Sequence, residues 1–391
     1  MLTTGNFVSI FFFVAVVFLG VCVLIWRNSE CDSVDGVTGG KQGAGKENQL
    51  GDSGCVSPVP EKWEIDKTKA IKPDTIFVSI ASYRDVECRD TVYQMFEAAS
   101  NPDRIFAGVV QQNKLKEEDC FDKCPDCKKR KDSGHIKVLD YDFKDAKGPC
   151  FARYQASKLW DGEAYYLQID SHTKFVDGWD DTLLEEFKRT NDPKAVISGY
   201  PPTEEQLAKI IKQNYNEFPM MCETKFNKDG LPQVTAKIIK RNDYNPVPVA
   251  YGGAGLLCMP AQALLDVNYD PYLNFLFFGE ELLHSARLWT SGYNFYAPLK
   301  PFISHYYSRK GAPKFWDDNK EFEKCRQKAI HRVKYILGLG PLDKVEEDFR
   351  VDIEKYGLGK QRSMKEYWKF MGVDFDKRDQ VVNRCTMDGY R

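Results

Sequence analysis

The sequence contains few histidines and almost no net charge. Only five of its 391 residues are histidine, and its formal net charge is -2 at pH 7. A chain so close to neutral lacks the positive field that nucleic acids attract, so we expect no nucleic-acid partner. Because histidines are so scarce, a histidine beside other residues of metal-ligand type is stronger evidence for a metal site than it would be in a histidine-rich chain.

The sequence also lacks several common signatures. It has no Asn-x-Ser/Thr sequon, so N-glycosylation gives no indication of the compartment. The glycines in the stretch 251–259 have neither the spacing of a dinucleotide-binding loop nor that of a P-loop. Glycines followed by apolar residues predict instead a backbone that approaches a ligand closely and then enters a strand.

One long hydrophobic run is present, at residues 7–26. Twenty residues at ~1.5 Å each span the ~30 Å hydrocarbon core, and Trp26 with Arg27 ends the run as an interface anchor would. A cleaved signal peptide fits less well, because the run is long and no Lys or Arg precedes it. We therefore predict a short tail (1–6), a transmembrane anchor and, from the Gly-, Ser- and Asp-rich composition, a flexible stem at 27–73.

Strand-like and helix-like segments alternate after the stem. An apolar segment at 75–81 precedes a helical pattern at 88–99, and a second apolar segment follows at 105–110. This order predicts an α/β fold with parallel strands, whose ligands bind beyond the carboxyl ends of the strands. Further strands are expected at 136–141, 165–169, 195–200 and 293–298, and helices at 179–187 and 280–289.

The chain changes character near residue 313. Residues 320–337 and 342–355 have helical spacing and mixed charge. We expect a catalytic domain at 74–312 and a helical C-terminal extension at 313–391. Residues 201–250, which contain several prolines, are expected to be irregular and to include an exposed loop.

One predicted strand is followed directly by residues of the types that bind metal ions. The apolar segment 165–169 runs directly into Asp170, Ser171 and His172. An Asp and a His two positions apart can face one cation, and this pair of donors favours Mn²⁺ over Mg²⁺. The alternative is that both side chains only cap the following turn. Another apolar run ends at His305.

Polar residues follow the first two predicted strands. Arg84 and Asp85 come after the first strand, and Gln111 and Gln112 come at the end of the second. Their position beyond the carboxyl ends makes them candidates for binding a ligand. The alternative is that they are ordinary loop residues.

Two predicted helices begin with residues suited to a site. A Gly-Pro start followed by Arg153 points a guanidinium and backbone N–H groups in one direction, which suits a diphosphate. Glu280 and Glu281 open a later helix and are candidates for lining a pocket. For both helices the alternative is a plain N-terminus, where acids are favoured by the helix dipole.

A local cysteine cluster consists of Cys120, Cys124 and Cys127, with His135 nearby. These are zinc-ligand types, whereas a lumenal domain would favour disulfides. Free thiols are a third interpretation, and the pairing cannot be derived from spacing.

Three motifs resemble a single enzyme family. They are Ser79-Ile-Ala-Ser-Tyr-Arg-Asp85, Gly148-Pro-Cys-Phe-Ala-Arg153 and Leu167-Gln-Ile-Asp-Ser-His172. As a set they resemble the polypeptide (hydroxyproline) N-acetylglucosaminyltransferases, which have a cytoplasmic branch and a membrane-anchored Golgi branch. The segments that end at His172, Glu281 and His305 are also similar to polypeptide GalNAc-transferases, which are metal-dependent, retaining GT-A enzymes.

The resemblance implies a GT-A fold, a Rossmann-like mixed sheet flanked by helices. It implies Mn²⁺ or another divalent cation bound by Asp170, His172 and His305, with UDP-GlcNAc as the donor. It further implies that Arg84, Asp85 and Arg153 hold the uridine diphosphate. Asp170, as a metal ligand, and Gln111, from its position after a strand, are also expected to bind the donor. Glu280 and Glu281 would face the sugar or the acceptor.

The expected function is transfer of GlcNAc to a Ser, Thr or hydroxyproline hydroxyl of a polypeptide, with retention of configuration. The anchor and stem distinguish this chain from the cytoplasmic branch. We expect a single-pass type II protein of the Golgi or ER membrane whose catalytic domain is lumenal. The alternatives are another donor such as UDP-GalNAc, a glycan acceptor, or a non-catalytic lectin-like ectodomain.

Overall fold

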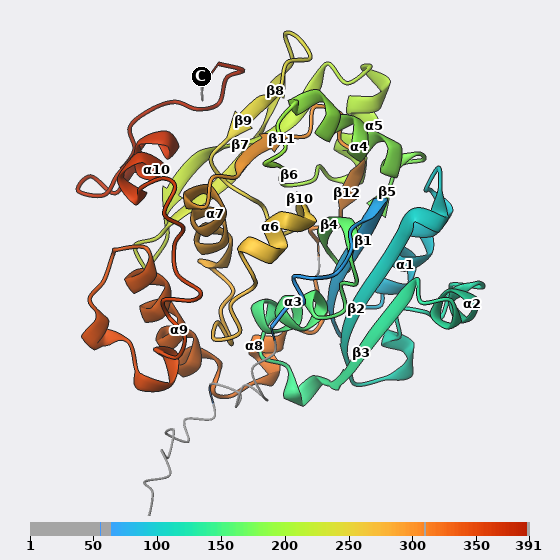
Figure 1. Ribbon diagram of the computed structural model, residues 1–391, viewed down its shortest axis with the longest axis horizontal. Helices are drawn as coiled ribbons and strands as arrows, with labels where there is room; N and C mark the ends of the chain where they lie inside the picture. The colour runs from blue at the N-terminus through green and yellow to red at the C-terminus, as the bar shows by residue number, and fades with distance from the viewer. Residues whose placement is uncertain (1–54, 56–63, 309, 389–391) are drawn as a thin grey trace, which may run out of the picture. The chain divides into compact units, whose positions relative to one another are not determined.

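The structure is a computed structural model that describes Cys55 and residues 64–308 and 310–388 (Figure 1). These residues belong to one compact unit, which spans Leu50–Arg391. The predicted tail, the anchor at 7–26 and much of the stem lie outside the described ranges. Within those ranges, no helix is both long enough and apolar enough to cross a membrane.

A mixed sheet of eight strands forms the centre of the described chain. Its first four strands in space are parallel to one another, and β10 runs antiparallel to both of its neighbours. The spatial order is β3 (Ile136–Asp142), β2 (Ile105–Asn113), β1 (Lys72–Tyr83), β4 (Glu163–Asp170), β10 (Leu256–Pro260), β6 (Ala195–Ser198), β11 (Asn294–Ala297) and β9 (Val247–Val249). The predicted mixed α/β sheet is therefore confirmed.

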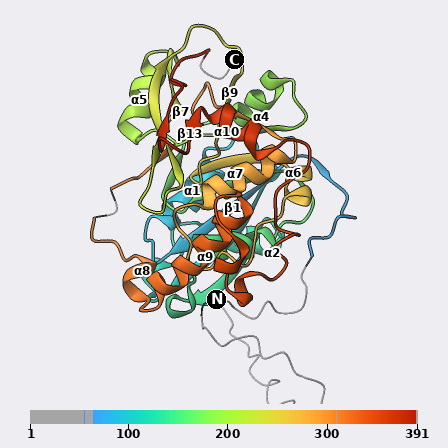
Figure 2. The same ribbon diagram turned by 90° about the vertical axis from the view of Figure 1, so that its left-hand side faces the viewer.

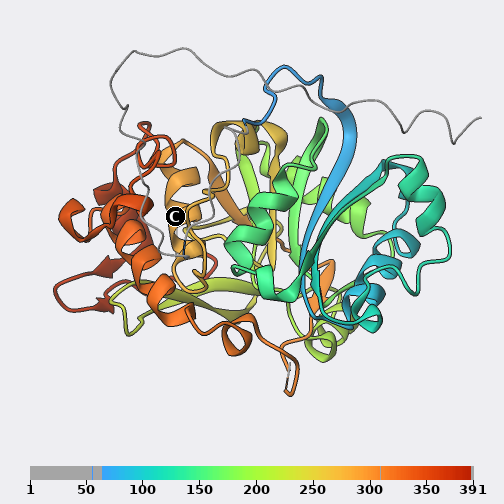
Figure 3. The same cartoon turned by 90° about the horizontal axis from the view of Figure 1, so that it is seen from below.

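Helices cover both faces of this sheet because its central strands are buried on both sides. Along β1, Phe77 packs into one hydrophobic core, while Ile76 and Val78 pack into the other. The first core contains α3 (Pro149–Ser157), α6 (Ala261–Asp266), α7 (Glu280–Thr290) and α9 (Phe322–Ile336). The second contains α1 (Cys88–Glu97) and α4 (Trp179–Thr190). Seen from below, the orange and red C-terminal segments and the cyan region that contains α1 and α2 (Cys127–Asp132) lie on opposite sides of this unit (Figure 3).

Two small strand pairs stand beside the main sheet. β5 (Thr173–Phe175) pairs antiparallel with β12 (Ile303–His305), and β7 (Glu217–Phe226) pairs antiparallel with β8 (Pro232–Lys240). Together with α5 (Glu204–Lys212) and β9, the β7–β8 hairpin shows that the expectation of an irregular 201–250 was wrong. Pro219 in β7 and Pro232 in β8 are tolerated because the two strands form a separate two-stranded sheet, where the missing N–H group of a proline does not interrupt a central strand.

The C-terminal part packs against α7, as the orange and red ribbons of Figure 2 show. It contains α8 (Phe315–Asp318), α9, α10 (Met364–Met371) and the short pair β13 (Val373–Asp374) and β14 (Asp379–Gln380). The predicted helix at 342–355 is wrong, because this segment has only two 3-10 turns, Leu342–Lys344 and Glu347–Phe349. Two carbonyls of this segment, those of Phe349 and Val351, accept hydrogen bonds from the Arg332 guanidinium instead of from a helical N–H.

Eight cysteines of the described residues form disulfides. The bonds are Cys55–Cys325, Cys88–Cys120, Cys124–Cys127 and Cys222–Cys385. The disulfide interpretation of the cysteine cluster is thus confirmed, and the zinc interpretation is wrong because all three thiols are consumed. His135 instead stacks on Phe106 and contacts Ser133. The short helix α2 (Cys127–Asp132) begins at the last cysteine of this cluster.

Candidate active site

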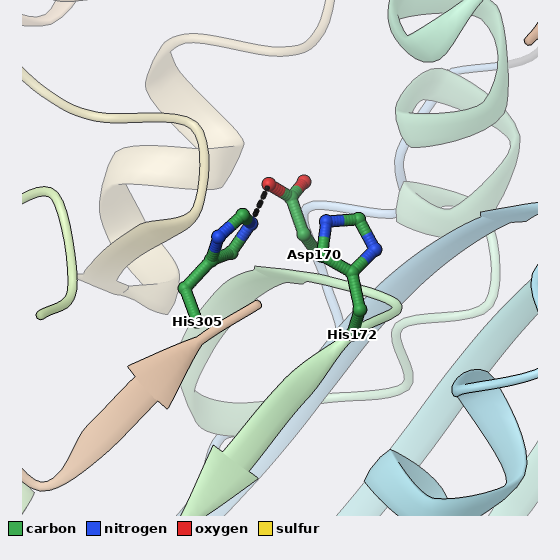
Figure 4. Close-up of side chains that lie close together, drawn as sticks. All are labelled: Asp170, His172 and His305. Carbon is green, nitrogen blue, oxygen red and sulfur yellow. Dashed lines mark hydrogen bonds and ion pairs between the residues drawn. The ribbon is translucent and has the colours of Figure 1, made fainter. Parts of the chain in front are cut away.

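Strand pairing assembles three metal-ligand side chains from two distant segments. β4 ends at Asp170, and the chain turns through His172 into β5. Because β5 pairs with β12 in a register that sets His305 opposite Thr173, His305 lies next to that turn. The close-up in Figure 4 shows the three side chains converging from the ends of their strands.

The three side chains fit a divalent cation. One ligand atom from each of Asp170, His172 and His305 lies within 4.8 Å of the other two. Asp170 Oδ2 is 3.1 Å from His305 Nε2. A Cβ on Gly255 would come within 3.3 Å of Asp170 Oδ2, so glycine lets the backbone approach the carboxylate. One carboxylate and two imidazoles are donors that Mn²⁺ accepts.

Asp85 holds His172 from behind. Its Oδ2 atom lies 2.8 Å from His172 Nδ1 and accepts a 2.7 Å hydrogen bond from the Ser171 hydroxyl. Asp85 is only 3% exposed. A carboxylate on Nδ1 fixes the orientation of the ring and leaves Nε2 available for a metal. The structure therefore places Asp85 behind a candidate metal ligand.

Arg153 connects the metal-ligand cluster to α7. Its guanidinium forms a 3.0 Å ion pair with Asp170 Oδ1 and a second ion pair with Glu280. Burial opposes ionisation of Asp170, but His305 and the positive charge of Arg153 outweigh burial and hold the pKa of Asp170 well below its usual range. Arg153 lies on the short helix α3. This helix begins at Pro149, directly after Gly148, whose φ is positive at 89°.

Glu280 and Glu281 point to different partners. Glu280 accepts a 2.9 Å hydrogen bond from the Cys150 thiol in addition to its ion pair with Arg153. Glu281 accepts from the Tyr200 hydroxyl and from the Ala254 backbone N–H, both at 2.7 Å. Burial raises the pKa of Glu281 to about 7, although these two hydrogen bonds lower it. The structure thus brings both glutamates to the edge of the cluster, by separate contacts.

Arg84 and Gln111 are engaged elsewhere at the carboxyl ends of β1 and β2. Arg84 has a positive φ of 46°, and its guanidinium pairs with Glu118 at 3.3 Å and with Asp318 at 2.7 Å. Gln111 donates to Asp140 at 2.5 Å and accepts from the Cys120 backbone N–H. Within the described part of the chain, neither side chain forms a hydrogen bond or ion pair with the metal-ligand cluster.

Sequence reasoning missed several contributors to the site. Tyr200 and Ala254 hold Glu281, and Gln168 donates to the Ala254 carbonyl at 2.7 Å. Away from the cluster, Asp318 accepts from both Tyr83 and Arg84 and so holds Arg84 apart from the metal ligands. Two of these contributors lie in stretches that carried a signal in the sequence: Ala254 in the glycine-rich stretch and Gln168 in the motif that ends at His172. Tyr200 and Asp318 have no local pattern that could have identified them.

Comparison with known proteins identifies one sequence family. The sequence model described as Glycosyltransferase (GlcNAc) matches residues 75–132 and 123–377. No curated protein matches the sequence.

Solved structures give a more distant comparison. The chain is similar to the crystal structure of GalNAc-T7 with UDP, GalNAc and Mn²⁺, with a TM-score of 0.50 and 14% sequence identity. The match covers 79% of this chain and 59% of that one, so this chain spans less than two thirds of GalNAc-T7. The mannosyltransferase PcManGT from Pyrobaculum calidifontis, in complex with GDP-Man and Mn²⁺, matches with a TM-score of 0.39 and 11% identity, over 80% of this chain and 75% of that one. The likeness to GalNAc-T7 supports the GT-A fold.

Proposed function

Since the chain belongs to the Glycosyltransferase (GlcNAc) family, we propose that it transfers GlcNAc from UDP-GlcNAc to a polypeptide hydroxyl. The acceptor residue is Ser, Thr or hydroxyproline, and the configuration at the sugar is retained. The observation that carries the proposal is the convergence of Asp170, His172 and His305 beside Arg153 at the carboxyl end of β4.

The metal ligands and Arg153 have one shared task in this proposal. Breaking the bond between the sugar and UDP leaves negative charge on the departing phosphate. A divalent cation held by Asp170, His172 and His305, of which Mn²⁺ fits the donors best, would supply a Lewis acid for that charge. Arg153 adds a fixed positive charge, since its buried side chain cannot swing away from Asp170. GalNAc-T7, which shares the fold, binds UDP, GalNAc and Mn²⁺.

The two glutamates hold the sugar end of the site. Glu281 is fixed through the Ala254 N–H, next to Gly255, and Gly255 in turn borders Asp170. A carboxylate in this position orients sugar hydroxyls by accepting their hydrogen bonds. In retention, the acceptor oxygen bonds to the anomeric carbon on the face that UDP leaves. The hydroxyl proton then passes to the departing phosphate oxygen, which has taken the electron pair of the broken bond.

The proposal includes a position in the cell. Residues 7–26 form a membrane anchor, 74–312 the catalytic domain and 313–391 its extension. Residues 27–73 form a stem whose last part joins the folded unit, because Cys55 is bonded to Cys325 and β1 begins at Lys72. The four disulfides support an oxidising compartment. We place the protein in the Golgi or ER membrane as a single-pass type II protein with a lumenal catalytic domain.

The first test is hydrolysis of a panel of UDP-sugars by the full chain, with MnCl₂ and then with EDTA. Selective release of UDP from UDP-GlcNAc that EDTA abolishes is the expected result. Release from UDP-GalNAc alone would replace the donor and keep the chemistry, a candidate supported by the likeness to GalNAc-T7. No release from any donor by a folded protein would refute the enzyme and favour a binding ectodomain.

A further inference from the structure

A hollow of about 740 Å³ opens beside the candidate metal ligands. His172 and His305 form part of its wall. Its volume is within the range of ligand-binding pockets. Among the described residues, it is lined by none of the other side chains assigned to the donor, which are Arg84, Asp85, Gln111, Arg153, Asp170, Glu280 and Glu281. The hollow therefore reaches His172 and His305 from a side that none of these expected donor-binding side chains lines.

The charges in this hollow are mostly negative. Its lining includes one lysine, Lys174, against four carboxylates, Glu87, Asp90, Glu204 and Glu205. All four lie at the N-terminal ends of α1 and α5, where the helix dipole stabilises an anion. The dipoles account for the carboxylates being tolerated there. The dipoles alone do not explain why two acidic helix ends face one open hollow next to the candidate metal ligands.

Two of these carboxylates have no counter-charge among the described residues. Asp90 forms an ion pair with Lys123 at 2.7 Å, and Glu204 pairs with Lys174 at 2.6 Å. Glu87 and Glu205 take part in no ion pair within that part of the chain. A cation brought into the hollow would meet unpaired negative charge, whereas an anion would be repelled.

Two tyrosines extend the hollow from the end of β12. Tyr306 and Tyr307 line it, and each is 52% exposed. The Tyr307 hydroxyl donates to the Pro201 carbonyl, which fixes the ring beside His305. An exposed aromatic face attracts Lys and Arg side chains and packs on their methylene groups.

We propose, resting on the function proposed above, that this hollow binds the acceptor and selects a polypeptide with Lys or Arg close to the reactive hydroxyl. The carboxylates Glu87 and Glu205 contact the basic side chains, and Tyr306 and Tyr307 pack against them. Acidic peptides and anionic glycans are disfavoured by the same charges.

The test measures binding of three labelled 11-residue peptides to the full chain with MnCl₂ and UDP, by fluorescence anisotropy. The peptides share a central Thr and differ only in their flanking residues, which are Lys, Gln or Glu. We expect the Lys peptide to bind at least about tenfold more tightly than the Glu peptide, with an affinity that falls as NaCl rises. Equal affinities, the opposite order, or no binding of any peptide would overturn the proposal.

Variants assign the effect to the hollow. Glu87→Gln with Glu205→Gln should weaken the Lys peptide about tenfold, and Glu205→Lys should make the Glu peptide the tighter ligand. Glu347→Gln is the control, since Glu347 is an exposed carboxylate at the start of a 3-10 turn outside the hollow. The same loss in the control, or no reversal with Glu205→Lys in a protein of unchanged melting temperature, would overturn the proposal.

Hydrolysis of UDP-GlcNAc by the same preparation separates the two proposals. If the wild-type chain hydrolyses UDP-GlcNAc with Mn²⁺ but peptide binding does not follow charge, only the acceptor inference is wrong. If it hydrolyses no UDP-sugar, the proposed function itself is wrong.

Discussion

His305 Nε2 lies 3.1 Å from Asp170 Oδ2, although 135 positions separate the two residues in the sequence. Asp170 ends a strand of the main sheet, and His305 ends a strand outside it. The short β5–β12 pair joins the two segments, and next to it the Tyr306 backbone N–H donates to the His172 carbonyl at 3.1 Å. The metal-ligand set therefore depends on three residue pairs of backbone register.

Removing either ligand should abolish metal-dependent chemistry. Asp170→Asn and His305→Ala each take one of three donors, so Mn²⁺ affinity should fall at least about tenfold and UDP release from UDP-GlcNAc about 100-fold. Calorimetric titration with MnCl₂ and a UDP-release assay measure the two effects. His331→Ala on α9 is the control. Normal Mn²⁺ binding by both variants would show that the site lies elsewhere.

Replacing Arg153 by Lys should damage the site although the charge is kept. Lysine cannot pair with Asp170 and Glu280 in the same geometry as a planar guanidinium. We expect UDP release to fall about 100-fold, with a loss of about 2 kcal/mol in the free energy of unfolding.

Arg104→Lys is a matched control for that prediction. Arg104 also bridges two carboxylates, Asp180 and Asp181, but it lies on α4's side of the fold and outside the site. Its variant should lose stability and keep its rate of UDP release. If both variants lost activity equally, the special role of Arg153 would be refuted.

The stability of the protein should depend on pH through Glu281. Burial raises the pKa of this carboxyl from 4.5 to about 7, so the folded protein keeps a proton that the unfolded chain loses. This contribution is fully present below about pH 4.5 and is lost as the pH rises through about 7. Relative to Glu281→Gln, the wild-type chain should lose about 2–3 kcal/mol of unfolding free energy between pH 5 and pH 8. Urea unfolding at both pH values measures this difference, and parallel curves for the two proteins would contradict it.

The disulfides should differ in their effect on stability. Cys55–Cys325 spans 270 positions, whereas Cys124–Cys127 spans three. Chain entropy then predicts a loss of ~5 kcal/mol for Cys55→Ser with Cys325→Ser, but only ~2 kcal/mol for Cys124→Ser with Cys127→Ser. Unfolding by denaturant compares the variants, and mass spectrometry of unreduced peptides maps the bonds. Equal losses from the two pairs would argue against the 55–325 bond.

Local patterns determined much of the fold in advance. The apolar runs of β1, β2 and β4 were predicted within a few residues, because strands buried on both faces read as nearly continuous apolar sequence. The prediction of a helix at 342–355 was wrong because tertiary contacts override its local pattern. Its apolar residues have helical spacing, but the Arg332 guanidinium donates to the carbonyls of Phe349 and Val351, which a helix would use for its own hydrogen bonds.

The sequence by itself determined that Asp170 and His172 share one strand end, since two positions of chain hold them together. Only the tertiary structure decided which other residues join them. Pairing of β12 with β5 brings in His305, and packing of α1's entry segment places Asp85 behind His172. Such contacts come from sheet register and long-range packing, which leave no periodic trace in the sequence.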